Sequence, residues 1–444
     1  MLNTPNPRIR LPAGVRDFLP PAAARRRALS ERLLGEFERW GFERIITPLF
    51  ECADVLERGL GADAHATAIR FVEPVTGEVV ALRPDITPQV ARLVATRMNG
   101  EGGPIRLCYE GAVARMATGA RGQREILQAG VELYGAGAPE GDAEVIAVAA
   151  AALAAAHVPE VGLDVGHVGL VRHVLEAVAE EAQRAELAVA LRKKDRDGVA
   201  RAAAGLPRPL RALVEALPTL YGEPAAVLER ARELRLPPPL RRGLALVEEV
   251  LEATAPAAEA SLGRGGVTLD LGEVRGFDYY TGIRLAGYVA GAGEAVLRGG
   301  RYDQLAARYG KSSRAIGFAV DIEAMAEAQS AAGLPLPARP EGVLVAAVRD
   351  RRREAGQVAA ALRAAGHRAA VDLAGPQSRR ALVAYARRVG FTCVLELSRD
   401  GAAWLVEGAA AAEIPAAAVR RASTGDGAAL VLPRPAAEAA PAEE

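Results

Sequence analysis

The sequence predicts two folded domains: an α+β domain that carries a helical insertion, and a smaller α/β domain after it. The chain has 444 residues, more than a single hydrophobic core usually serves. Strand patterns occur on both sides of the stretch 167–258, whose own pattern is almost entirely helical. After a Pro- and Gly-containing segment, strands alternate with helices, which is typical of a mainly parallel sheet. We therefore expect domains at 1–330 and 342–433, a linker at 331–341, and a polar tail at 434–444 that is too Ala/Pro-rich to pack.

The first domain begins with an amphipathic helix at 22–40, in which the spacing of Leu29, Leu33 and Phe37 gives one buried face. A second helix is expected at 87–98, with Thr87 as its cap and the following proline in its first turn. An alanine-dense helix starts at Asp142. Strands are expected at 44–50, within 71–85, at 105–113 and 126–134, and after the insertion at 267–288 and 295–320.

The second domain shows three strand patterns and two helices. The helices are expected at 351–365 and 378–389, and a glycine follows each of them. The strands are expected at 343–348, 368–373 and 391–397.

Composition indicates a cytoplasmic protein without a structural metal. The formal net charge is zero, so a large basic surface for nucleic acid is not evident and nucleic acid is an unlikely partner. Cys52, Cys108 and Cys393 are isolated from one another, which suggests neither a zinc site nor a disulfide framework. The N-terminal residues contain no apolar signal segment, and the alanine-rich run ending near His157 is too short to span a membrane.

The stretch 272–303 has the composition of a small-molecule pocket wall. Arg275 supplies a planar cation that can bind a carboxylate or a phosphate in a bidentate manner. Tyr279 and Tyr280 point to opposite faces of a strand, and the glycine pair 299–300 allows a close approach of the backbone. An ordinary hairpin with tyrosines in the core is the alternative.

Six sequence blocks occur in order across nearly the whole chain: LPAGVRDFLP, ITPLFE, LRPDITP, ILQAGVELYG, VRGFDYYTG and RGGRYD. In this order they resemble histidyl-tRNA synthetase and its paralogue, the ATP phosphoribosyltransferase regulatory subunit. The resemblance implies a class II synthetase-like α+β core, with an antiparallel sheet flanked by helices, and a C-terminal anticodon-binding-like α/β domain. The region of Pro48 resembles motif 1, which builds a homodimer interface in that fold.

The resemblance also implies a histidine-binding site. Carboxylate and amide acceptors suit the ammonium and imidazole N–H groups of histidine, and arginines suit its carboxylate. The acceptor positions are Asp85, Thr87, Gln128 and Glu132, the tyrosines beside them are Tyr279 and Tyr280, and the arginines are Arg115 and Arg275.

The positions that would hold ATP in a synthetase depart from the family pattern. Ala117 stands where a glutamate helps to hold adenine, and Ala324 stands where an arginine clamps the γ-phosphate. Asp321 replaces a glycine and would repel a polyanion, so a loss of several kcal/mol of transition-state stabilisation is expected. Alternatively, Asp321 caps the helix that follows it.

These departures favour the non-catalytic regulatory subunit, which serves the first step of histidine biosynthesis. The resemblance implies a short-form ATP phosphoribosyltransferase catalytic subunit as partner, in a hetero-octamer, together with a homodimer through the class II core. It also implies L-histidine as a feedback ligand, with no catalytic residues and no cofactor. The alternatives are a divergent histidyl-tRNA synthetase and an RNA-binding factor on a synthetase scaffold.

Overall fold

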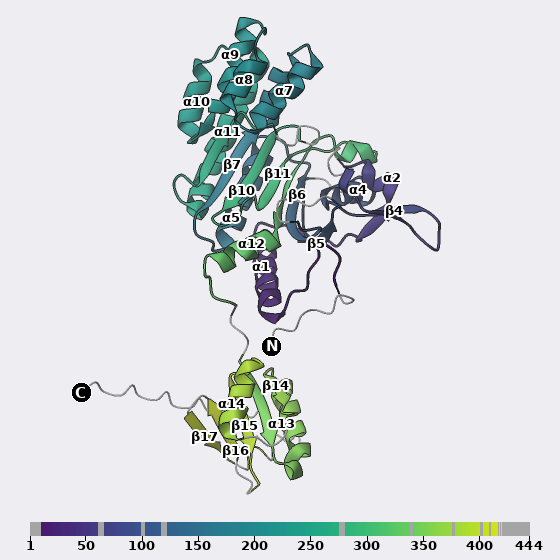
Figure 1. The fold of residues 1–444 in the computed structure, drawn as a ribbon, viewed down its shortest axis with the longest axis vertical. Coiled ribbons are helices and arrows are strands. Elements are labelled where there is room, and N and C mark those ends of the chain that lie inside the picture. Colours follow the sequence, from purple (N-terminus) through teal and green to yellow (C-terminus); the bar gives the residue numbers. More distant parts are fainter. Residues whose placement is uncertain are drawn as a thin grey trace, which may run out of the picture. The chain divides into compact units, whose positions relative to one another are not determined.

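The computed structural model divides the chain into two units, Met1–Leu336 and Pro337–Glu444 (Figure 1). The residues that the structure describes are 10–60, 66–98, 103–116, 122–274, 280–337, 341–374, 378–399, 403–407, 410–415, 417 and 419. The tail at 434–444 therefore lies outside the described residues.

A nine-stranded sheet forms the centre of the first unit. In spatial order its strands are β1 Glu43–Arg44, β5 Ile105–Ala114, β6 Glu125–Tyr134, β12 Ala315–Asp321, β11 Leu297–Arg301, β10 Ile283–Val289, β7 Val161–His167, β9 Val267–Asp270 and β8 Tyr221–Gly222. Neighbouring strands are antiparallel except in the pairs β1–β5 and β7–β9. The predicted antiparallel core flanked by helices is thus confirmed.

Side chains alternate between the two faces of this sheet and separate a large core from a ligand-sized cavity. On β6, Val131 and Leu133 belong to the large core, while Gln128 and Glu132 point to the opposite face. The helices that pack on the large-core face are α1 Pro20–Arg39, α5 Glu140–Ala155, α11 Pro238–Leu262 and α12 Ile322–Ala331. The other face holds a smaller core around α4 Thr87–Arg97 and the 3-10 turn η2 Ala306–Tyr309.

Two details near α4 differ from the expectations. Thr87 is the first residue of the helix and does not cap it, because Ile86 occupies the N-cap position with no side-chain hydrogen bond. The single strand expected at 44–50 is two strands, β1 and β2, with Pro48 between them; a proline cannot donate to a ladder. The second of these belongs to a small sheet of β2 Phe50–Cys52, β4 Val79–Leu82 and β3 Arg70–Val72, beside which lies α2 Ala53–Glu57.

The helical insertion follows β7. This strand was not among the expected strands, and it ends at residue 167, where the insertion was expected to begin. The insertion consists of α6 Val168–Glu176, α7 Glu181–Arg192, α8 Arg196–Ala202, α9 Arg208–Ala216, η1 Leu217–Thr219, the short strand β8, α10 Pro224–Glu233 and α11. Its helices rise from the end of the sheet, and α11 runs back to pack on α5 and β7 (Figure 1). The insertion is therefore continuous with the core of the first unit.

The second unit contains a five-stranded sheet in the order β14-β13-β15-β16-β17. The first three strands are parallel, as predicted, whereas β16 and β17 extend the sheet antiparallel and were not expected. The elements are β13 Gly342–Ala347, the 3-10 turn η3 Arg349–Arg351, α13 Arg352–Ala364, β14 Arg368–Val371, α14 Arg379–Arg388, β15 Cys393–Leu397, β16 Ala403–Glu407 and β17 Ala410–Ile414. In the part of the chain that the structure describes, no helix combines the length and the apolar character that crossing a membrane requires.

Candidate ligand-binding site

A cavity of about 180 Å³ lies on the α4 side of the large sheet. Its floor is formed by β6, β11 and β12, and the loop before α4 and the end of β5 form its walls. The lining residues are Asp85, Thr87, Arg115, Ile126, Gln128, Tyr280, Val296, Arg298, Gly299, Tyr302, Gly317, Phe318, Ala319 and Asp321.

The structure brings together six of the residues that the sequence suggested for histidine binding. Five of them, Asp85, Thr87, Arg115, Gln128 and Tyr280, line the cavity. Glu132 lies beneath the floor and contacts the hydroxyl of Thr87. Arg275 and Tyr279, like Ala117 of the suggested ATP region, lie outside the described residues. Contact of these side chains with a ligand stays a prediction.

Glu132 is the most deeply buried carboxyl group of the site, with an exposed fraction of 0 %. Its Oε1 accepts a hydrogen bond from the Tyr109 hydroxyl at 3.2 Å, and its Oε2 has no hydrogen-bond partner among the described residues. Burial, and secondarily the charge of Asp85, raise the pKa of Glu132 well above its usual value. The site thus contains a buried acceptor whose ionisation a cationic ligand would favour.

Gly317 makes room for this carboxyl group. A Cβ at this position would collide with Glu132 Oε2 and would lie 2.7 Å from the Tyr302 hydroxyl. Any side chain at residue 317 would therefore displace the acid or the tyrosine.

The lining of the cavity combines acceptors with a fixed arginine. The buried Oε1 of Gln128 has no hydrogen-bond partner among the described residues. Asp85 Oδ1 accepts from the backbone N–H of Thr87 at 3.4 Å. Arg115 donates from Nε to the carbonyl of Pro84 at 2.8 Å, so its guanidinium is held beside the Asp85 loop. Acceptors together with a guanidinium in one cavity suit a zwitterionic amino acid.

Tyr280 lines the cavity with a neutral phenol side chain. Burial raises its pKa further above the usual value. Its backbone carbonyl accepts from Arg172 Nη2 at 2.7 Å, which connects the cavity wall to α6 of the insertion.

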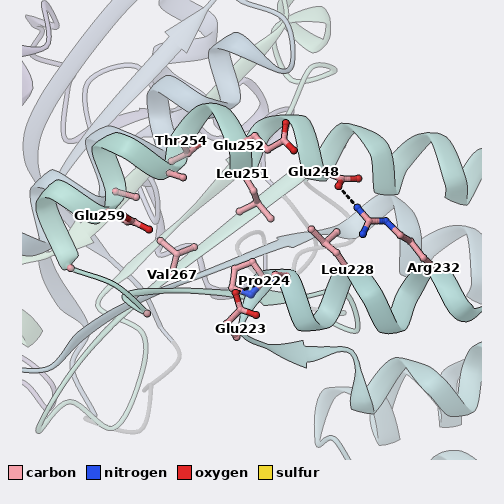
Figure 2. A pocket seen from close by; sticks show the side chains of 15 residues that line it. Glu223, Pro224, Leu228, Arg232, Glu248, Leu251, Glu252, Thr254, Glu259 and Val267 are labelled. Carbon is pink, nitrogen blue, oxygen red and sulfur yellow. Dashed lines mark hydrogen bonds and ion pairs between the residues drawn. The ribbon is translucent and has the colours of Figure 1, made fainter.

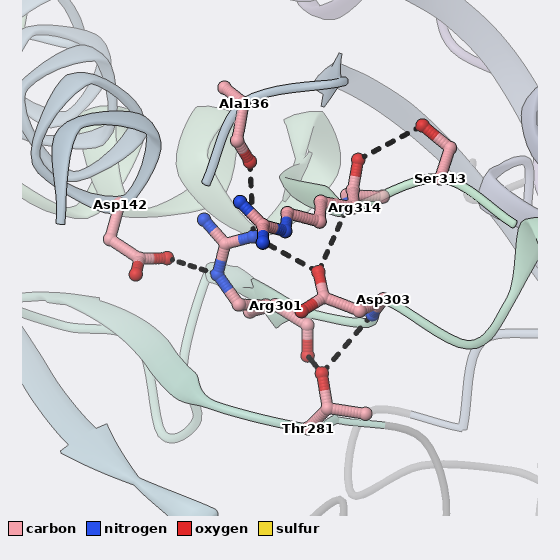
Figure 3. Close-up of polar contacts among 8 residues, drawn as sticks. Ala136, Asp142, Thr281, Arg301, Asp303, Ser313 and Arg314 are labelled. Atoms are coloured by element: carbon pink, nitrogen blue, oxygen red, sulfur yellow. Dashed lines mark hydrogen bonds and ion pairs between the residues drawn. The ribbon is translucent and has the colours of Figure 1, made fainter. Parts of the chain in front are cut away.

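The stretch 272–303 is only partly a pocket wall. Arg298, Gly299 and Tyr302 line the cavity, but Arg301 is buried in a separate ion-pair network (Figure 3). Its Nε donates to Asp142 Oδ1 at 2.8 Å and its Nη1 to Asp303 Oδ1 at 3.0 Å. Burial raises the pKa of Asp142 to about 6, although the charge of Arg301 acts in the opposite direction. Arg301 thus connects β11 to the start of α5.

The structure confirms the alternative expectation that Asp321 caps the helix after it. Its side chain accepts from the backbone N–H of Ala324 at 2.8 Å and so caps α12. Ala324 is 1 % exposed and belongs to the large core. Asp321 also lines the cavity, so its carboxylate both begins a helix and faces the site.

Sequence reasoning did not single out Tyr109 or Gly317. Tyr109 reaches Glu132 because β5 and β6 pair in a register that sets Tyr109 opposite Gly130. Gly317 faces Glu132 across the β6–β12 ladder. The only signal for either residue is strand register, which a single sequence does not supply.

No group of three or more His, Cys, Asp or Glu side chains placed to hold a metal ion occurs among the described residues.

Comparison with known proteins shows a consistent relationship. The family profile described as histidyl-tRNA synthetase matches residues 14–325. An ATP phosphoribosyltransferase regulatory subunit from Geobacter sulfurreducens is 39 % identical over 394 residues, which cover 88 % of this chain and 89 % of the relative. The protein of the same name from Anaeromyxobacter sp. is 44 % identical over 326 residues, covering 70 % of this chain and 89 % of the relative.

Solved structures agree with these sequence relationships. A protein from Bacillus halodurans, described as an ATP phosphoribosyltransferase regulatory subunit/histidyl-tRNA synthetase, superimposes with a TM-score of 0.76 at 29 % identity over 89 % of this chain and 100 % of that one. Histidyl-tRNA synthetase from Nostoc sp. has the same fold, with a TM-score of 0.75 at 19 % identity over 94 % of this chain and 99 % of that one. The chain therefore belongs to the ATP phosphoribosyltransferase regulatory subunit family, which is built on the fold of histidyl-tRNA synthetase.

Proposed function

We propose that this protein is a non-catalytic regulatory subunit of ATP phosphoribosyltransferase, which is required for the first step of histidine biosynthesis and binds histidine as a feedback signal. The observation that carries the proposal is the identity of 39 % to 44 % with relatives of that name, over most of their length. The name of these relatives implies a separate catalytic chain, and we infer a short-form ATP phosphoribosyltransferase as that partner, in a hetero-octamer.

Histidine is the ligand whose chemistry fits the cavity. Its ammonium and imidazole N–H groups require acceptors, and Asp85, Gln128 and Glu132 supply them at or beneath the cavity surface. Its carboxylate requires a planar donor such as the guanidinium of Arg115. Regulation further requires that histidine bind one state of the complex more tightly, with a typical coupling of about 1 to 3 kcal/mol.

Residues 321 and 324 support the lack of adenylation activity. Asp321 presents a carboxylate on the cavity wall, and the side chain of residue 324 is a buried methyl group. A triphosphate held there would meet an anion in place of a cation, which is unfavourable for phosphoryl or nucleotidyl chemistry.

A homodimer through the class II core is supported by an exposed apolar surface. This surface, called here the β-hairpin patch, belongs to the sheet β2-β4-β3 and the loops beside it, and the β3–β4 hairpin projects from the body of the unit (Figure 1). Its exposed residues are Ile46, Leu49, Phe50, Phe71, Val72, Val75 and Val79. Phe50 and Phe71 contact each other edge-on, with ring centroids 5.8 Å apart. Exposed apolar residues gathered on one small sheet are typical of protein interfaces.

The decisive experiment mixes the purified protein with a short-form ATP phosphoribosyltransferase catalytic subunit. We expect the two chains to co-purify and to form phosphoribosyl-ATP from ATP and phosphoribosyl pyrophosphate at a rate that neither chain reaches alone. Added histidine should change this rate. Failure both to co-purify and to enhance activity would overturn the proposal.

Histidyl-tRNA synthetase activity is the second candidate, and the matching family profile is the observation in its favour. Histidine-dependent exchange between pyrophosphate and ATP tests it directly. We expect no exchange above background, and measurable exchange would support the synthetase and refute the regulatory-only function.

A further inference from the structure

A groove of about 390 Å³ lies between α10 and α11 of the insertion, away from the histidine cavity. Leu228 from α10, Leu251 from α11 and Val267 from β9 form its apolar floor (Figure 2). Arg232 and Glu248 form an ion pair at one end of the groove, and Glu259 and Val267 lie toward the other end. Ala255 and Ala258 of α11 have small side chains that leave the groove open between these ends.

The rim of this groove carries a strong negative charge. The lining includes four glutamates, Glu223, Glu248, Glu252 and Glu259, and a single basic residue, Arg232. Arg232 is already paired with Glu248, and Glu223 caps α10 by accepting from the backbone N–H groups of Ala225 and Ala226. Glu252 and Glu259 are exposed, and no basic side chain stands among the lining residues to pair with them. An occupant of complementary charge must therefore be basic.

The shape of the groove favours a chain segment over a small cation. Glu252 and Glu259 are seven residues apart on α11, which separates them by about 10 Å along the helix axis. Between them lies the apolar wall that contains Ala255 and Ala258. A segment with basic side chains on both sides of an apolar one reaches both acids and covers this wall, as in the helix-in-groove mode of recognition.

The proposed function requires two different protein interfaces, and the first unit presents two surfaces of different character. The β-hairpin patch is apolar and suits a second copy of this chain. The groove is acidic, and a second copy that presents this groove in the same contact would place like charges together. The acidic end of the chain, residues 438–444 with three glutamates, also has the wrong sign to fill it.

We propose that the groove between α10 and α11 docks a basic, apolar-centred segment of the catalytic partner chain. This inference rests on the proposed function, because it assigns the partner's contact to a site on this chain. The Arg232–Glu248 ion pair links the two helices, and Glu252 and Glu259 attract the segment. The insertion thereby becomes the element through which the catalytic chain is held.

The test measures the affinity of the short-form catalytic subunit for the full-length protein by biolayer interferometry at low and at moderate salt. The double variant Glu252→Lys/Glu259→Lys should bind about tenfold more weakly and lose most of the salt dependence of the wild type. The matched control is Glu229→Lys/Glu249→Lys, which makes the same charge change on α10 and α11 at exposed residues outside the groove. The control should stay within about threefold of the wild type.

A second pair of variants tests the apolar part without changing charge. Ala255→Trp fills the groove at an exposed lining residue, whereas Ala253→Trp adds the same ring at an exposed residue of α11 outside it. Only the first should weaken binding. Equal affinities for groove and control variants, with the wild type binding normally, would overturn the groove assignment and leave the proposed function intact. A wild-type protein that does not bind the catalytic subunit at all would overturn both.

Discussion

Glu132 is the residue on which ligand binding by the cavity is expected to depend most. Its pKa is raised by burial, and a cationic ligand group beside it would lower this pKa again. Histidine binding should therefore release a proton and strengthen as pH rises toward the raised pKa. Titration calorimetry in buffers with different ionisation enthalpies measures this release. Glu132→Gln should abolish it and weaken binding by about 1.4 kcal/mol or more, a factor of ten.

Glu125→Gln is the matched control for this prediction. Glu125 begins the same strand, is exposed and does not line the cavity. It should bind histidine with wild-type affinity and wild-type proton release. A Glu132→Gln protein that behaves like this control would show that the buried acid does not contact the ligand.

Asp142 should make the stability of the fold depend on pH. Its pKa is about 6 in the folded chain against 3.8 in its usual range. A carboxyl group with a raised folded-state pKa stabilises the fold fully below its unfolded value, and this contribution is lost as pH rises through the folded value. The shift corresponds to about 3 kcal/mol at most between about pH 4 and pH 6.

Urea unfolding across this range should show a smaller loss of stability for Asp142→Asn than for wild type, whereas the exposed Asp54→Asn should follow wild type. Parallel curves for all three proteins would contradict the assignment.

At the scale of elements, Asp321 both caps α12 and lines the cavity, and substitutions at this residue test the capping role. Asp321→Ala removes the cap on the Ala324 N–H and should lower the free energy of unfolding by about 1 kcal/mol. Asp321→Asn retains an acceptor and should lower it much less. Chemical denaturation measures both changes, and equal stabilities for the two variants would argue against capping. Neither variant should gain pyrophosphate exchange, because residue 324 still lacks an arginine.

At the scale of the whole molecule, the β-hairpin patch should determine the oligomeric state. Light scattering after size exclusion should give twice the 46.4 kDa mass of the chain for the wild type. Val72 is 62 % exposed on β3, and Val72→Lys places a charge in the proposed interface, so we expect a shift toward monomer. Val189→Lys, at an exposed position on α7, should remain dimeric. A Val72→Lys protein that stays dimeric at micromolar concentration would move the interface elsewhere.

Much of the element order could be predicted from the sequence, because hydrophobic period and helix boundaries are local properties. The expected strands at 105–113 and 126–134 agree with β5 and β6 within a residue at each end. β7 was missed because, although Val161, Leu163 and Val165 alternate, the glycines at 162 and 166 weaken the strand pattern between them. β16 and β17 were missed because short strands added to one side of a sheet depend on their neighbours for stability.

The sequence by itself determined the family, and it placed acceptors at 128 and 132 that strand alternation brings to one face. Only the tertiary structure decided that Tyr109 and Gly317 surround Glu132, and that Arg301 binds Asp142 away from the cavity. It also decided that α10 and α11 leave an acidic groove between them. The physical reason is that register and helix packing join residues far apart in the chain, so their outcome is set by contacts that no local pattern encodes.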